Sequence, residues 1–175
     1  GVFPKLNLAT DLTKALDCST SPAATITLTT TGGNTSPASN YTYEVSFNGG
    51  PFAAASNPFT ATTAGNYVFK VTDANNPTLC QATTIFDLDP IQPTVFSTTP
   101  TNVSCFSGTD GTITVNVTSG IGPFEYQLDA GAFQSSNVFS GLAAGNAYVI
   151  TVRDAKLCLY PSAPIAITEP VILTA

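Results

Sequence analysis

The sequence predicts an all-β protein built from two tandem β-sandwich domains, and three observations support this. Apolar and polar residues alternate with a period of two along most short segments, as expected for strands with one buried face. Turn-forming Gly, Asn and Pro residues separate these segments. The chain also contains nearly the same phrase twice, as GNYVFKVTDA at 65–74 and GNAYVITVRDA at 145–155.

Strand patterns follow one another in chain order in both halves. They cover 26–28, 41–45 and 67–71 in the first half, and 113–117, 124–128 and 148–152 in the second. The residues predicted to face the core in the doubled phrase are Tyr67, Phe69, Val71, Tyr148, Ile150 and Val152. Lys70 and Arg153 alternate with them and are expected on the outer faces. Only residues 9–17, ATDLTKALD, offer a helical alternative, as one short turn.

The internal repeat extends beyond the doubled phrase when Cys18 is aligned with Cys105. Seven residues after each cysteine begins a Thr-rich strand pattern, TITLTTT at 25–31 and TITVNVT at 112–118. An aromatic-rich strand, a Gly-containing turn and two Phe residues then follow in both halves. Short strands with one buried face, separated by turns at regular spacing, favour a β-sandwich.

Acidic-Pro pairs mark the boundaries of the repeat. Asp89-Pro90 precedes the second unit, and Glu169-Pro170 follows it. We therefore predict β-sandwich domains at 1–89 and 90–170, with residues 171–175 as the start of a following unit. On this interpretation the chain is part of a longer array.

Composition excludes several classes of function. The chain has no His, which rules out Cys/His zinc sites and Ser-His-Asp triads. Its net charge of −6, with five basic residues, argues against nucleic acid or an anionic membrane as partner. No apolar run approaches the roughly 18 residues that a membrane span requires. No membrane insertion is expected.

No catalytic residue or cofactor is predicted, and the chain is not expected to be an enzyme. The acids Glu44, Glu125 and Asp129 are the candidates for a catalytic carboxylate pair. They do not keep their places between the two units, and on the strands they alternate outward. We interpret them as residues of solvated strand faces.

Four cysteines occupy matching places, two in each unit. A metal or redox site is disfavoured because there is no Cys-x-x-Cys pattern and the thiols lie in two domains. We predict one intradomain disulfide per unit, Cys18–Cys80 and Cys105–Cys158. Disulfides imply an oxidising, extracytoplasmic compartment. A bridge of this kind would also limit how far a pulled unit can extend.

Two further sets of residues are candidates for binding. Asp73 and Asp154 occupy the same place in both units, and with Asp89 of the linker they are candidate calcium ligands. An Asp that closes a turn explains the same pattern, and no metal site is predicted. The aromatic candidates for a sugar-stacking platform are Tyr41, Tyr43 and Tyr126. They lie in the apolar phase of their strands, which favours the core.

Three stretches of the second unit carry a resemblance to a known family: CFSGTDGTITV at 105–115, GPFEYQL at 122–128 and VRDAKLC at 152–158. They are similar to the SprB-type repeat of large cell-surface (gliding-motility) adhesins of Bacteroidetes. The resemblance implies tandem immunoglobulin-like (Ig-like) modules, secretion by the type IX route and an extracellular place in a surface adhesin filament. The family brings no catalytic residues. The first unit is assigned by internal alignment.

The sequence thus predicts a structural spacer module of a secreted cell-surface adhesin or filament. It would provide length, stiffness and display for adhesion or gliding. The expected partners are neighbouring repeat units of the same chain, together with surface polysaccharide or other surface proteins. Two alternatives stay open. One is a carbohydrate-binding or accessory module of a secreted enzyme, and the other is a filament protomer that self-assembles by strand exchange.

Overall fold

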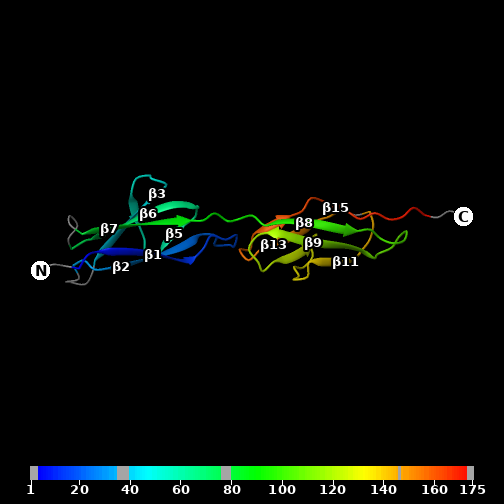
Figure 1. Cartoon of the computed structure of the whole chain (residues 1–175), viewed down its shortest axis with the longest axis horizontal. Coiled ribbons are helices and arrows are strands. Elements are labelled where there is room, and N and C mark those ends of the chain that lie inside the picture. Colours follow the sequence, from blue (N-terminus) through cyan, green and yellow to red (C-terminus); the bar gives the residue numbers. More distant parts are fainter. Residues whose placement is uncertain (1–3, 35–39, 76–79, 146, 173–175) are drawn as a thin grey trace. The chain divides into compact units, whose positions relative to one another are not determined.

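A computed structural model gives the fold of the chain (Figure 1) and describes residues 4–34, 40–75, 80–145 and 147–172. Every regular element in these residues is a β-strand. The described part of the chain contains no helix that is long and apolar enough to cross a membrane. The prediction of an all-β protein is confirmed.

The first of two compact units is Gly1–Ile91, and the second is Gln92–Ala175. In the first unit, one antiparallel sheet has the strand order β1-β2-β5 and the other has the order β4-β3-β6-β7. The strands are β1 (Asn7–Lys14), β2 (Ala24–Thr31), β3 (Tyr41–Phe47), β4 (Ala53–Ala55), β5 (Phe59–Ala61), β6 (Gly65–Asp73) and β7 (Gln81–Leu88).

The helical alternative for residues 9–17 is wrong, because residues Asn7–Lys14 form β1. This strand pairs with β2 from Asn7↔Thr31 to Lys14↔Thr25, with a register shift near its end. Its helical pattern was weak, and β2 is a long Thr-rich strand of high β-propensity. Pairing with β2 therefore decides the conformation of this segment.

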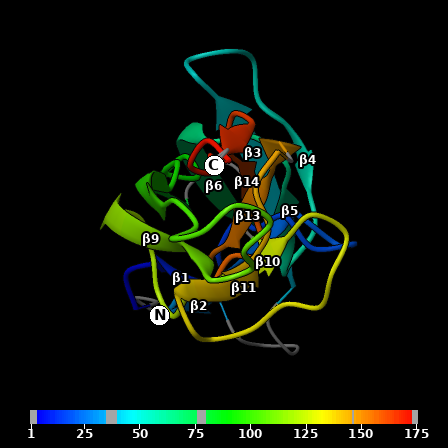
Figure 2. The ribbon, with the colours of Figure 1, turned by 90° about the vertical axis from the view of Figure 1, so that its right-hand side faces the viewer.

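The second unit repeats this arrangement with mostly shorter strands. One sheet has the order β11-β9-β8, another has the order β10-β13-β14, and β12 pairs with β15. Figure 2 labels β9, β10, β11, β13 and β14 of this unit. The strands are β8 (Val95–Thr101), β9 (Gly111–Ser119), β10 (Glu125–Leu128), β11 (Val138–Leu142), β12 (Ala147–Tyr148), β13 (Ile150–Arg153), β14 (Leu159–Pro161) and β15 (Ile165–Ala166). Val171 and Ile172 are exposed, and residues 173–175 of the predicted following unit lie outside the described residues.

Each unit has its own apolar core between its sheets. All six residues predicted to face inward in the doubled phrase are buried, which confirms the strand phase. In the first unit, Tyr67 and Phe69 pack in one cluster with Ile26 and Leu28 of β2. In the second unit, all three pack with Ile113 and Val115 of β9. Both sheets of a unit thus contribute to one core, as in a β-sandwich.

Two side-chain bonds recur at equivalent positions and brace both units. The hydroxyl of Tyr67 donates to Thr63 O at 2.6 Å, and that of Tyr148 donates to Ala143 O at 3.0 Å. A Tyr that bonds the backbone a few residues upstream is the tyrosine corner of Ig-type sandwiches. In addition, Asn57 Nδ2 donates to Leu28 O at 2.7 Å, and Asn137 Nδ2 donates to Val115 O at 2.8 Å.

The two ends of each unit are distinct, and we call them proximal, where the chain enters, and distal, where it leaves. The proximal end of the first unit contains the start of β1, the end of β2, the end of β6 and the start of β7. Its distal end contains the β1–β2 connection and the end of β7, where Leu88 pairs with Gly65. In the second unit, the β13–β14 turn is proximal and the β8–β9 connection is distal.

Candidate functional site

Asp73 joins the two sheets at the proximal end of the first unit. Its side chain is fully buried (0% exposed). Oδ2 accepts the backbone N–H of Asn34 at 2.6 Å, and Oδ1 accepts that of Asn75 at 2.9 Å. Asn34 follows β2 in one sheet, whereas Asp73 ends β6 in the other. The carboxylate therefore links the two sheets and also closes the turn that follows it. We call these hydrogen bonds of a buried Asp the latch.

Asp154 makes the corresponding latch in the second unit. Oδ1 accepts the backbone N–H groups of Lys156 and Cys158, both at 2.9 Å. Oδ2 accepts the hydroxyls of Thr94, just before β8, and Tyr160, in β14, both at 3.4 Å. Partial burial, together with the nearby charge of Asp154, raises the pKa of Tyr160. In both units, the buried Asp of the doubled phrase thus links the two sheets and closes the turn that follows it.

The structure places the three calcium candidates differently. Asp73 and Asp154 are buried at proximal ends and bonded to protein donors, whereas Asp89 is exposed in the linker. Among the described residues, no group of three His, Cys, Asp or Glu side chains could hold a metal ion. Turn and sheet closure accounts for both buried carboxylates. The absence of a metal site stays a prediction.

The predicted disulfide pairing is wrong in both units. The disulfide-bonded cysteines are Cys18 and Cys158, and Cys105 is a thiol. One cysteine of each predicted pair is therefore disulfide-bonded. The reason lies within each unit: Cys18 is in the distal β1–β2 connection, whereas Cys80 directly precedes β7 at the proximal end.

A strand as long as β2 separates the two cysteines of the first unit. Its eight residues span about 23 Å at about 3.3 Å per step. A disulfide needs Cα atoms within about 7 Å of each other. The second unit repeats this layout, with Cys105 distal and Cys158 in the proximal turn. Intradomain bridges are therefore excluded by the topology.

Two of the outward acids are held by cations, one in each unit. In the first, Glu44 Oε2 lies 2.6 Å from Lys70 Nζ, which also lies 4.6 Å from the centre of the Phe52 ring. In the second, Arg153 Nε donates to Glu125 Oε2 at 2.9 Å, and its guanidinium carbon lies 4.0 Å from the centre of the Phe133 ring. The third candidate, Asp129, accepts the backbone N–H of Val149 at 2.9 Å and so joins the end of β10 to the start of its partner strand β13.

The aromatic residues considered as a sugar platform are engaged inside the units. The hydroxyl of Tyr41 donates to Gly32 O at 2.6 Å. The hydroxyls of Tyr43 and Thr30 are 3.0 Å apart and link β3 to β2. Tyr126 is buried in the second core. The structure therefore brings none of the three to a flat exposed surface.

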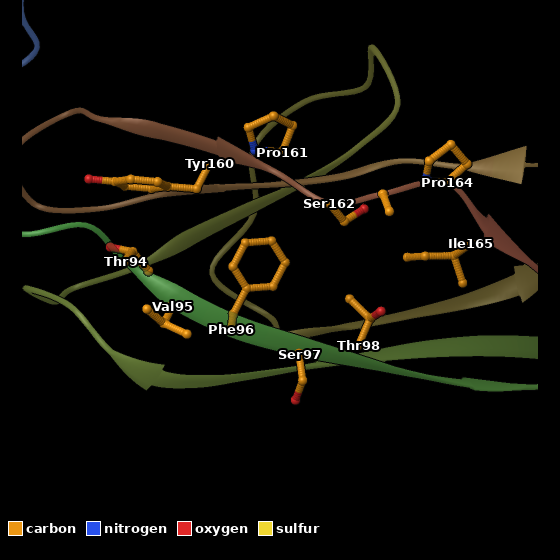
Figure 3. A pocket seen from close by; sticks show the side chains of 11 residues that line it. Thr94, Val95, Phe96, Ser97, Thr98, Tyr160, Pro161, Ser162, Pro164 and Ile165 are labelled. Carbon is orange, nitrogen blue, oxygen red and sulfur yellow. The ribbon is translucent and has the colours of Figure 1, made fainter.

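A groove of about 670 Å³ lies within the second unit, between β8 and the segment around β14 and β15 (Figure 3). Residues 94–98 form one wall and residues 160–165 form the other. The ring of Phe96 lies between the two walls in Figure 3. None of the lining residues is charged. The lining thus offers hydroxyl groups and apolar surface, but no acid or base for catalysis.

Sequence reasoning missed three repeated features. The Asn57 and Asn137 bonds were visible as an Asn two residues before the second Phe of each unit. Phe52 and Phe133 were aligned, but their contacts with cations were not predicted. Lys70 and Arg153 occupy different alignment positions, so only the three-dimensional pairing of strands reveals that each one meets an acid and an aromatic ring.

Comparison with known proteins supports the family resemblance. Residues 97–133, which include β9 and β10, match the SprB repeat model. The resemblance is confirmed over this segment. No curated protein matches the chain. Among solved structures, the fibronectin(III)-like modules of Clostridium thermocellum CbhA are 13% identical, with a TM-score of 0.36, over 93% of this chain and 95% of that chain.

Proposed function

We propose that this chain is a pair of Ig-like structural modules from the repeat array of a secreted cell-surface adhesin or filament. The observation that carries the proposal is the contrast between framework and surface. The buried Asp latch, the tyrosine corner and the Asn bond recur at equivalent positions in both units. The residues that repeat between the two units are therefore those that stabilise the fold of each module.

The outer faces do not repeat in the same way. In the internal alignment Lys70 matches Thr151, and Arg153 matches Thr72, so the cation has moved two positions along its strand. Its Glu partner has moved with it, from Glu44 to Glu125. A shared binding or catalytic site would need the same outward groups at the same places. Such compensation instead supports modules that keep fold and solubility, and a role without catalysis.

The match to the SprB repeat supports a place at the cell surface, with adhesion or gliding as the context. Two features support a spacer function. The linker between β7 and β8 is short and contains Pro90 and Pro93, and prolines restrict the backbone. Length and stiffness would then display a ligand-binding region carried elsewhere in the array. The expected partners are neighbouring units, with surface polysaccharide or other surface proteins at the end of the array.

Surface labelling tests this function. Cells that produce the parent protein would be probed with antibodies against this chain, before and after lysis and after external protease. Labelling of intact cells that protease removes is the expected result. Labelling that requires lysis would overturn the proposal. Retention of a polysaccharide by the purified chain on a glycan array would instead favour a carbohydrate-binding module.

A further inference from the structure

Two segments carry the chain into and out of the second unit: β8 follows the entry, and β14 and β15 lead to the exit. Both run from the proximal to the distal end of the unit. β8 pairs with β9, β14 with β13 and β15 with β12, and among the described residues no strand pairing joins β8 to β14 or β15. The groove of Figure 3 separates the two segments instead. The seam between entry and exit is therefore open along its middle.

Hydrogen bonds among the described residues close this seam at its distal end. The N–H of Val103 donates to Thr168 O at 3.2 Å. The N–H of Thr168 donates to Asn102 Oδ1 at 2.9 Å, and Glu169 Oε2 accepts the N–H of Ser107 at 2.8 Å. We call these bonds the distal clasp. They attach the departing chain to the connection that follows β8.

The residues beside the distal clasp belong to the core of the unit. Ile167 is 1% exposed and Val103 is 3% exposed, and both lie in the same apolar cluster. The N–H of Gly145 donates to Ile167 O at 3.0 Å and holds the exit segment from its other side. Separation of the exit segment from the β8–β9 connection would therefore open the core to water.

A pull on the two ends of the unit loads the distal clasp in shear. Because the entry and exit segments run in the same direction, the force draws β8 toward the proximal end and residues 167–169 toward the distal end. Hydrogen bonds between neighbouring extended segments lie across the chain direction, so this sliding strains all bonds of the clasp at once. Bonds loaded in this way have to break together, whereas the bonds of a hairpin that is peeled apart break one after another.

We infer that the distal clasp determines how long the second unit resists a pull on its two ends. On the entry side, β8 pairs with β9 over all of its seven residues. On the exit side, β15 pairs with β12 over two residues. The exit side therefore yields first, and the clasp reinforces that side. The use of the clasp in a filament under tension rests on the proposed function.

Pulling the full chain at constant force tests the clasp. Handles attached through azide-bearing residues in place of Pro93 and Val171, both exposed, would pass the force through the second unit and leave the first outside its path. A reductant keeps disulfides out of the measurement. Asn102→Ala removes one bond of the clasp. It should shorten the lifetime of the unit under force about fivefold, the factor that corresponds to about 1 kcal/mol for one hydrogen bond.

Gln127→Ala is the matched control. Gln127 Nε2 donates to Gly131 O at 2.6 Å, so this substitution also removes one exposed bond between a side chain and the backbone. The bond lies in the turn after β10, away from both loaded segments, and it is still intact when the clasp breaks. The lifetime under force should therefore stay unchanged. Equal shortening by the two substitutions, or no shortening by Asn102→Ala, would overturn the inference.

A second pair of variants tests the bond of Glu169. Glu169→Ala should shorten the lifetime at least as much as Asn102→Ala does. Glu169→Gln keeps a carbonyl acceptor for the N–H of Ser107 and should retain most of the lifetime. Equal lifetimes of the two Glu169 variants would contradict the part of this bond in the clasp. None of these results depends on surface labelling, so a failure here is distinguishable from failure of the proposed function.

Discussion

The Oδ1 atom of Asp154 accepts the backbone N–H of Cys158 at 2.9 Å. The same oxygen also accepts the N–H of Lys156, so one buried carboxylate determines the shape of the turn that presents the cysteine. Leu157, inside this turn, has φ of 62°. The turn therefore holds a residue in a left-handed conformation that needs such support.

Asp154→Ala is expected to lower the free energy of unfolding by about 2–4 kcal/mol, because it leaves several donors without their charged acceptor. Urea denaturation would measure the loss. Asp11→Ala, on the exposed face of β1, is the control and should change stability by less than about 0.5 kcal/mol. Equal effects of the two substitutions would contradict the latch.

Gly33→Ala should damage the latch of the first unit. A Cβ at Gly33 would lie 2.8 Å from Asp73 Oδ2, at a φ of +79°. Gly49 is a matched control, since it has φ of +75° and nothing within 4 Å of its Cβ. Backbone strain of about 1–2 kcal/mol is expected for both substitutions. Thermal unfolding should show an additional loss for Gly33→Ala alone, and equal losses would mean that Asp73 adapts.

Phe69→Ala should destabilise the first unit by about 3–5 kcal/mol, since it empties a fully buried site in the core. Lys70→Ala removes the Glu44 ion pair and the Phe52 contact on the outer face. It should cost less than about 1 kcal/mol, because solvent screens a partly exposed pair. Chemical denaturation of both variants would test the strand phase, which predicts the larger loss for Phe69.

The carboxyl group of Asp17, next to Cys18, should titrate at an unusually low pH. Hydrogen bonds from Lys14 and Ser19 lower its pKa from 3.8 to about 2. Because the folded pKa lies below the unfolded one, its contribution to stability is present above pH 3.8 and is lost as the pH falls through about 2. An NMR titration of the carboxyl carbon should show this midpoint. Lys14→Gln should raise it toward 3.8, and an unchanged midpoint would show that Lys14 is not the cause.

The sequence by itself determined the strands and their inward faces. Side chains alternate across a strand with a period of two, so the burial of Phe69 and Ile150 is a local property that can be read along the chain. The internal alignment likewise predicted that Asp73 and Asp154 share a role. It could not show the donors of each carboxylate, because Asn34 and Thr94 come from distant segments of the other sheet.

Only the tertiary structure decided at which end of its unit each cysteine lies, and the conformation of residues 9–17. The spacing of two cysteines gives the number of residues between them. It does not tell how many times the chain runs from one end of the sandwich to the other. Between Cys18 and Cys80, the long strands β2, β3 and β6 each carry the chain from one end of the unit to the other. An odd number of such crossings leaves the two cysteines at opposite ends. Residues Asn7–Lys14 form β1 because β2, a strand of the same length, pairs with them along the whole segment. The pattern of residues 9–17 alone does not reveal this partner.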